Sequence, residues 1–343
     1  MIKDLQVSPS FRAALIYISV IILCFGCNKT DDHRELIPVK VGITSYIGEA
    51  ASFVAAENGL FEKHGLDVTL QVNQAGSESV RQLLGEEVEI AHVAETPILY
   101  SILDDTYFTG EKKGNLQIVS NMIFANRIQK VLARRDSGIE SPQDIRGKKV
   151  ALAGGTQLEY LLDSFLLEHR IEIEEIDTVH MSVSDQVDAI RRGEIDVAVI
   201  WEPHAANIEF QLGDNAVLLP TRLTYSTLWL TTVLDSYAEE NPEVISAYLR
   251  ALLEAQQLIR NNPGWAIDLL ASHTSVQREV VERAILQVDY ELNLTERMLN
   301  LLTEQQQWMV DNSMANQPEV NIFELINFRF MEEVHPNGIT IIR

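Results

Sequence analysis

Two passages of the chain repeat the same order of polar and apolar positions. Residues 85–97 read GEEVEIAHVAETP, and residues 193–203 read GEIDVAVIWEP. Each passage follows a short amphipathic stretch, begins with glycine, continues as a largely apolar run, and ends in a glutamate near a proline. This order predicts a helix, a glycine at its carboxyl end, and a strand of a parallel sheet.

A second pair of matching apolar runs lies upstream of the repeated passages, at residues 39–44 and 149–154. After the first of these runs, residues 50–59 have a helical spacing of apolar positions, and residues 66–72 alternate as a strand. A strand, a helix and a strand in this order favour a parallel sheet. We therefore expect an α/β protein with two lobes of similar design.

The chain is expected to cross between the lobes twice. Apolar strands at residues 116–124 and 129–133 are separated by a short link, and a return crossing is expected near residues 222–230. From residue 241 onward the apolar spacing is helical almost throughout, which predicts a helical segment packed on the first lobe. The predicted divisions are 38–125 for the first part of lobe I, 126–224 for lobe II, and 225–343 for the return to lobe I with the C-terminal helices.

The N-terminal residues have the pattern of an export signal. An apolar run at residues 13–25 follows Lys3 and Arg12, and it is short for a membrane-spanning helix but typical of a secretory signal. With Gly26 and Cys27 after it, the run resembles a bacterial lipoprotein signal, which implies lipidation of Cys27; an uncleaved amphiphilic anchor is the alternative. We assign residues 1–26 to the signal peptide and residues 27–37 to a flexible tether.

Length, charge and cysteine content limit the classes of function. The 343 residues are enough for two cores, and the net charge of -23 opposes binding to nucleic acid or to an anionic lipid surface. A helix N-terminus or an arginine can still bind an anion locally in an acidic protein. Cys24 leaves with the signal peptide, so the exported body, with Cys27 alone, has no disulfide bond.

Glu95 and Glu202 end the two repeated passages, just beyond the predicted strands. Ligands of open α/β sheets bind at the carboxyl ends of strands, so both carboxylates are expected where the lobes face each other. Three roles are open for them: a general acid and base, a grip on a cationic or amide group, or caps of the helices that follow. Trp201 is either a ring that stacks on a ligand or the apolar end of a strand.

Residues 153–157 (AGGTQ) form a turn between a predicted strand and a predicted helix. Free backbone N–H groups at such a turn bind carboxylate, sulfonate, phosphate or nitrate oxygens, and a plain tight turn is the alternative. The equivalent residues 44–48 of lobe I supply two hydroxyls and an aromatic ring. Arg127 and Arg222 lie at the two crossings, where they pair with an acidic ligand or remain surface residues.

The sequence shows no pattern for a cofactor, a metal site or covalent catalysis. His64, His92, His180 and His204 are scattered, and the chain has no HExxH motif, no GxGxxG motif and no phosphate-loop lysine. It also has no GxSxG motif, and Cys27 is assigned to the lipid. We therefore expect no metal, no cofactor and no catalytic residue.

Three stretches give the chain a resemblance to a known family. Residues 56–68 read AENGLFEKHGLDV, residues 141–151 read SPQDIRGKKVA, and residues 192–203 read RGEIDVAVIWEP. Over about residues 39–260 the chain resembles the solute-binding proteins of ABC transporters, in the branch that serves nitrate, sulfonates, taurine and thiamine-precursor pyrimidines. The resemblance implies a two-lobed, periplasmic-binding-protein-like type II fold that closes around its ligand at a hinge.

The resemblance also implies where the ligand binds. Members of the branch take their ligand from loops that correspond here to Ser45, Tyr46, Gln74, Gly76, Ser77, Glu95, Thr96, Gly154, Gly155, Thr156, Trp201 and Glu202. We add Arg127 and Tyr225, at the two crossings, as further candidate ligand-binding residues. A relative of the same fold is an enzyme that makes a thiamine pyrimidine with a cysteine-rich metal segment, and this chain has no such segment.

The sequence therefore predicts a monomeric solute-binding protein outside the cytoplasm, in the periplasm or at the cell exterior, attached to the membrane only through its lipid. It captures a small polar organic molecule or anion, such as a sulfonate, taurine, nitrate or a pyrimidine precursor, for an ABC permease and its ATPase. The first alternative is a cleft enzyme, a lyase or thiamine-pyrimidine synthase with Glu95 and Glu202 as acid and base. The second is a sensory module for a membrane kinase.

Overall fold

The computed structural model describes residues 35–104, 114–221, 226–274 and 276–342. The chain divides into Met1–Glu35 and Leu36–Arg343, and every element described below belongs to the second unit. The predicted signal peptide, the lipidation residue Cys27, and the candidate residues Arg222 and Tyr225 lie outside the described residues.

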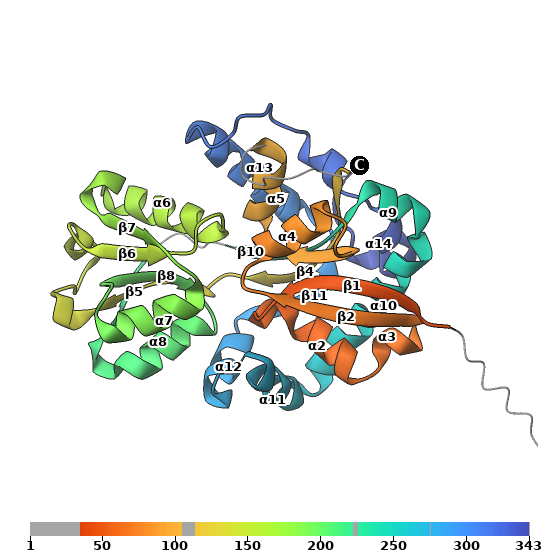
Figure 1. Ribbon diagram of the computed structural model, residues 1–343, viewed down its shortest axis with the longest axis horizontal. Coiled ribbons are helices and arrows are strands. Elements are labelled where there is room, and N and C mark those ends of the chain that lie inside the picture. The colour runs from red at the N-terminus through yellow and green to blue at the C-terminus, as the bar shows by residue number, and fades with distance from the viewer. Residues whose placement is uncertain (1–34, 105–113, 222–225, 275, 343) are drawn as a thin grey trace, which may run out of the picture. The chain divides into compact units, whose positions relative to one another are not determined.

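The strands form two sheets (Figure 1). The first sheet has six strands in the order β11-β4-β10-β3-β1-β2, and the second has five in the order β7-β6-β8-β5-β9. The strands are β1 Ile37–Thr44, β2 Leu66–Asn73, β3 Ile90–Val93, β4 Leu116–Ala125, β5 Gln129–Arg134, β6 Lys149–Leu152, β7 Asp177–His180, β8 Val197–Trp201, β9 Ala216–Leu219, β10 Thr227–Leu234 and β11 Val288–Asn293.

Strands β3 and β8 contain the apolar runs of the two repeated passages. In the first sheet, β1 is parallel to β2 and β3, and β10 is antiparallel to β3. In the second sheet, β6 is parallel to β7 and β8, and β5 is antiparallel to β8. Val41 pairs with Ile90 in one sheet as Val150 pairs with Val197 in the other. The predicted α/β class, with two lobes of similar design, is confirmed.

Helices pack against both sheets (Figure 1). They are α2 Ala50–Glu57, α3 Leu60–Lys63, α4 Gly76–Leu84, α5 Glu95–Leu103, α6 Gln157–His169, α7 Val183–Arg192, α8 His204–Leu212, α9 Asp235–Glu240, α10 Pro242–Asn261, α11 Pro263–Thr274, α12 Arg278–Ile285, α13 Glu296–Asp311 and α14 Arg329–Val334. Helix α4 packs on β1 and β3, and α7 packs in the same way on β6 and β8. None of the described helices combines the length and the apolar character that a bilayer crossing requires.

The two helices that precede the repeated strands end differently. After α7, Gly193 has a φ of 74°, the left-handed conformation that glycine adopts without strain. Gly85 stands at the end of α4 as predicted, but its φ is -87°, and the left-handed residue is Glu86, with a φ of 57°. The N–H of Glu86 bonds to the carbonyl of Leu83 at 3.0 Å, so a non-glycine residue closes this turn.

One strand interrupts the C-terminal segment for which the apolar spacing predicts helix almost throughout. Strand β11 pairs antiparallel with β4 at the edge of the first sheet. Its residues alternate, with Asp289 and Glu291 exposed and their neighbours on both sides buried. The helical prediction is wrong here because this period-two pattern spans only a few residues between helices. The surrounding helices do pack on the first lobe, where α10 contacts α2 and α3, and α13 contacts α5.

The chain passes from one sheet to the other between β4 and β5 and returns between β9 and β10. The predicted divisions after residues 125 and 224 fall at these two passages. They stay predictions, and the order of the strands supports them. The side-chain amide of Gln129, at the start of β5, donates to the hydroxyl of Thr227, at the start of β10, so the two passages are joined to each other.

Candidate functional site

Three aromatic rings from both sheets meet where β1 and β8 end and β10 begins. Tyr46 follows β1, Trp201 ends β8, and Trp229 lies near the start of β10. The Tyr46 ring lies edge-on to the Trp201 ring, with centroids 6.4 Å apart, and is tilted against the Trp229 ring at 4.7 Å. All three side chains are buried. Tyr46 and Trp201, both predicted from the sequence, are therefore brought together across the lobes. Trp229 was not among the predicted site residues.

Four buried polar atoms, two of them on these aromatic side chains, have no hydrogen-bond partner among the described residues. They are Thr44 Oγ1, Tyr46 OH, Gln129 Oε1 and Trp201 Nε1, and a fifth atom of this kind, Gln186 Oε1, lies on α7. Gln129 and Trp201 are directly paired residues of β5 and β8. Because most buried polar side-chain atoms in proteins are paired, this group indicates a place where a bound molecule supplies partners. Thr44 and Gln129 were not among the predicted site residues.

A buried chain of hydrogen bonds holds the Trp229 ring in place. Trp229 Nε1 donates to Glu49 Oε1 at 2.8 Å, and the other oxygen of Glu49 lies 2.8 Å from His92 Nδ1. His92 Nε2 lies 3.0 Å from the hydroxyl of Tyr248. His92, one of the scattered histidines of the sequence, thus takes part in a protein network. The network orients Trp229, against which Tyr46 packs.

Glu95 is fully buried at the first turn of α5. Its carboxylate accepts from the backbone N–H of Leu228 at 3.1 Å and from Gln305 Nε2 at 3.0 Å. Thr96 donates to the same glutamine at 2.6 Å, which ties the start of α5 to α13. Burial raises the pKa of Glu95 to about 7, against the lowering effect of the hydrogen bonds that it accepts.

Glu202 has the bonds of a helix cap and of a buried ion pair. Its Oε2 accepts from the backbone N–H of Ala206 in α8 at 2.9 Å, and its Oε1 lies 2.6 Å from Lys130 Nζ. The carboxylate is 1% exposed and the lysine side chain is 14% exposed. The peptide bond from Glu202 to Pro203 is cis. This arrangement corresponds to the capping role, one of the three alternatives that the sequence leaves open for Glu202.

The surroundings of Tyr46 keep its hydroxyl neutral. Burial raises the pKa of Tyr46 well above its ordinary value, and the nearby Tyr290, Glu95, Glu49 and Glu202 raise it further. The hydroxyl is therefore a neutral group that can both donate and accept a hydrogen bond at any physiological pH. The same causes show that acidic side chains lie around this ring.

The predicted turn after β6 is tightly packed. Thr156 caps α6, because its Oγ1 accepts from the N–H of Leu158 at 3.3 Å and donates to the carbonyl of Ala153 at 2.7 Å. A Cβ at Gly154 would lie 2.7 Å from Nδ1 of His180, and Gly155 has a φ of 66°. These contacts account for the glycines and the threonine as parts of a close turn, which was the alternative to anion binding.

The other predicted loop residues of lobe I have local contacts. The backbone N–H of Gln74 donates to Glu78 at 2.9 Å, and the hydroxyl of Ser45 donates to the carbonyl of His273 at 3.4 Å. A Cβ at Gly76 would come within 2.9 Å of Val93 in β3. Ser77, next to it in α4, is buried. Within the described part of the chain, no hydrogen bond joins these residues to Tyr46 or Trp201.

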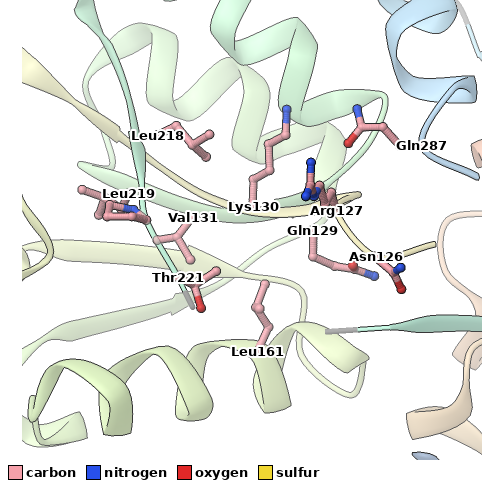
Figure 2. Close-up of a pocket in the computed structure, with 11 residues that line it drawn as sticks. Asn126, Arg127, Gln129, Lys130, Val131, Leu161, Leu218, Leu219, Thr221 and Gln287 are labelled. Carbon is pink, nitrogen blue, oxygen red and sulfur yellow. The ribbon is translucent and has the colours of Figure 1, made fainter. Parts of the chain in front are cut away.

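Arg127 lines a cavity of about 450 Å³ at the first passage between the sheets. Figure 2 shows its side chain on the same side of β5 as those of Lys130 and Gln287, whereas Gln129 points to the other side. Arg127 is exposed. The structure therefore brings Gln129, rather than Arg127, to the side of the strand where Trp201 lies.

Metal binding has no support in the described part of the chain, where no group of three or more histidine, cysteine, aspartate or glutamate side chains is placed to hold an ion.

The chain is similar to proteins of one family. The family model described as NMT1/THI5 like matches residues 48–266. A Brucella abortus protein named as a binding protein is 26% identical over 253 residues, which cover 72% of this chain and 74% of that protein. The taurine-binding periplasmic protein of Escherichia coli K12 is 24% identical over 223 residues, which cover 63% of this chain and 64% of that protein.

Solved structures share the fold. The alkanesulfonate-binding protein SsuA of Xanthomonas axonopodis pv. citri, bound to MOPS, matches with a TM-score of 0.71 at 18% identity, over 86% of this chain and 99% of that one. The desulfurization enzyme DSZB matches with a TM-score of 0.63 at 15% identity, over 88% of this chain and 99% of that one. The periplasmic-binding-protein-like fold is confirmed, and both a binding protein and an enzyme use it.

Proposed function

This chain belongs to the NMT1/THI5-like family, and we propose that it is an extracytoplasmic solute-binding protein of an ABC importer. It encloses a small polar organic molecule or anion between its two lobes and presents it to a permease that works with an ATPase. The names of its relatives as binding proteins, and the fold that it shares with SsuA, support this role.

One observation carries the proposal: unpaired polar atoms from both lobes lie buried at the ends of facing strands. Tyr46 comes from the first sheet, and Gln129 and Trp201 come from the second. Leaving a buried polar atom unpaired costs about 1–3 kcal/mol, so a solute that pairs with these atoms stabilises the arrangement in which the lobes meet. Binding then shifts the protein toward its closed state.

The unpaired donors of the site suit a small solute with hydrogen-bond acceptors. The indole of Trp201 donates only, and the neutral hydroxyl of Tyr46 can also donate. Sulfonates, taurine, nitrate and pyrimidine precursors all carry acceptor atoms, and they are the ligand classes that we propose.

We also propose that the mature protein begins at Cys27 and is held at the membrane by a lipid on this residue. The apolar run before it and the polar stretch after it support this assignment. A Cys27→Ser variant expressed with its own signal should move from the membrane fraction to the soluble fraction. Equal membrane retention of both proteins would contradict lipid anchoring and leave the solute-binding role untouched.

A cleft enzyme is the second candidate, and one observation favours it. Glu95 has a pKa of about 7, which suits proton exchange near neutral pH, and the enzyme DSZB has the same fold. Glu202 does not match this role, because Lys130 and an amide of α8 already hold its carboxylate. We therefore propose binding without turnover.

The test begins with the ligand that the protein carries. Native mass spectrometry of protein purified from its own host should detect a small molecule, which is recovered unchanged after incubation. Conversion of that molecule into a product would favour the enzyme instead.

A matched pair of variants then tests the site. Trp201→Phe removes the indole N–H but keeps an aromatic ring, so affinity for the recovered molecule should fall by about 1–3 kcal/mol in isothermal titration. Trp265→Phe, in a half-buried ring of α11, should leave affinity unchanged. Equal affinities of the two variants would show that the indole N–H of Trp201 does not bind the ligand.

A further inference from the structure

We propose that the ligand of this site must carry both a hydrogen-bond acceptor and a hydrogen-bond donor, and that Gln129 is the residue that selects for the donor. This inference rests on the proposed function and narrows its substrate class. It separates solutes that have an N–H or O–H group from anions that only accept hydrogen bonds, such as nitrate and unsubstituted alkanesulfonates.

The unpaired atoms differ in the hydrogen bonds that they can form. An indole Nε1 only donates, so Trp201 needs an acceptor from the ligand. An amide Oε1 only accepts, so Gln129 needs a donor. The hydroxyls of Thr44 and Tyr46 can both donate and accept, so they can pair with a ligand that already satisfies Trp201 and Gln129.

Gln129 and Trp201, which carry these two atoms, stand side by side in the second sheet. Gln129 begins β5, Trp201 ends β8, and the two residues are Cα partners in this antiparallel pair. Directly opposed residues of an antiparallel pair project to the same face of the sheet, with Cβ atoms about 4.5–5.5 Å apart. A ligand that accepts from Trp201 is therefore beside Gln129.

In the structure, the Gln129 amide directs its Nε2 toward the neighbouring strand. Its Nε2 donates to the hydroxyl of Thr227, the first residue of β10. This bond leaves Oε1 as the free end of the amide, and the side chain, 8% exposed, lines the cavity at the passage between the sheets (Figure 2). The backbone N–H of the next residue, Leu228, binds the carboxylate of Glu95.

Selection follows from the cost of leaving the amide oxygen unpaired. A solute that carries an acceptor and also an N–H or O–H group pairs with both Trp201 and Gln129, whereas a donor-free solute leaves Oε1 buried without a partner. Sites built to bind an N–H or O–H group discriminate strongly against analogues that lack it.

The test uses pairs of solutes that differ in one donor group. Taurine is compared with ethanesulfonate, and 4-amino-2-methylpyrimidine with 2-methylpyrimidine, by isothermal titration with the full mature chain. In any pair that binds, we expect the member with the donor group to bind at least about 10-fold more tightly than the member without it. Equal affinity of the two members would overturn the inference. It is the result expected if the amide presents its N–H to the ligand, because an N–H requires no donor from the solute.

Variants then assign the selection to Gln129. Gln129→Met keeps the length of the side chain and removes its acceptor, so the preference within a pair should disappear. Gln287→Met, on the opposite side of β5 and lining the same cavity, should keep it. Circular dichroism melts check that both variants fold, and a preference that survives in folded Gln129→Met would overturn the assignment.

The proposed function and this inference fail in different ways. Binding of no solute in the panel, together with no small molecule in protein from its own host, would reject the solute-binding role and the inference with it. A co-purified molecule without any N–H or O–H group would reject the inference alone.

Discussion

The indole N–H of Trp308 donates to the carboxylate of Asp163 at 2.8 Å, which joins α13 of the first lobe to α6 of the second. Two further contacts lie on the same face of α6. The ring of Tyr160 meets that of Trp308 at a centroid distance of 5.1 Å, and Tyr100 of α5 donates to Glu159 at 2.7 Å. These contacts join the two lobes through residues other than the aromatic rings of the candidate site.

Removing the Trp308 hydrogen bond should loosen the closed arrangement. Trp308→Phe deletes the donor and keeps a ring, and one hydrogen bond contributes about 0.5–1.5 kcal/mol, more when its partner is charged. We expect the ligand-free variant to have a larger radius of gyration by small-angle X-ray scattering than the parent protein, and a saturating ligand to reduce the difference. Trp265→Phe is the control, and scattering identical to it would show that this contact does not bias closure.

Glu95 should make the stability of the protein depend on pH. Burial raises its pKa to about 7 from an ordinary value of 4.5, so between these values the folded protein holds a proton that the unfolded chain has released. The free energy of unfolding therefore falls as the pH rises through this window, by roughly 3 kcal/mol once the pH is above 7.

Urea unfolding of Glu95→Gln across pH 4 to 8 measures this contribution, because the variant has no proton to lose at this position. The free energy of unfolding of the parent protein should decline more steeply than that of the variant, mostly between about pH 4.5 and 7. Parallel curves would show that the carboxyl group has the same pKa in the folded and unfolded chains.

Lys130 should be important for stability because it neutralises a buried carboxylate. Lys130→Met leaves Glu202 buried without its cation, which should lower the free energy of unfolding by roughly 3 kcal/mol. The double variant Lys130→Met with Glu202→Gln should recover much of this loss. The matched control is Lys63→Met, whose partner Glu254 lies at the surface and whose loss should cost less than about 1 kcal/mol. Equal losses in the two single variants would contradict a special role for the buried pair.

Gly76 tests whether a predicted ligand residue is in fact required for packing. A Cβ at this position would lie 2.9 Å from a methyl carbon of Val93 and 3.2 Å from its Cα, so Gly76→Ala should destabilise the protein by about 1–3 kcal/mol. Gly264→Ala, where a Cβ would have no neighbour within 4 Å, should be neutral or stabilising. Urea unfolding compares them. If ligand affinity falls in Gly76→Ala without any loss of stability, Gly76 is a ligand-binding residue after all.

The architecture was accessible from the sequence because its signals are local. The repeated passages predicted β3 and β8 correctly, since an apolar run after a helix end carries its own periodicity. The edge strand β11 was missed for the same reason, because its short alternation lies between helices and is stabilised by pairing with β4. Pairing of that kind joins residues far apart in the chain, and no local pattern reports it.

The same distinction between local patterns and tertiary pairing applies to the residues of the candidate site. Sequence alone marked Tyr46, Trp201, Glu95 and Glu202 as residues at strand ends, and all four are buried there. Only the tertiary structure decided that Lys130 holds Glu202, and that Gln129 stands beside Trp201 with an unpaired oxygen. The physical reason is that the sequence pattern reports which side chains leave water, whereas the partners of a buried polar group depend on which strands the fold makes neighbours.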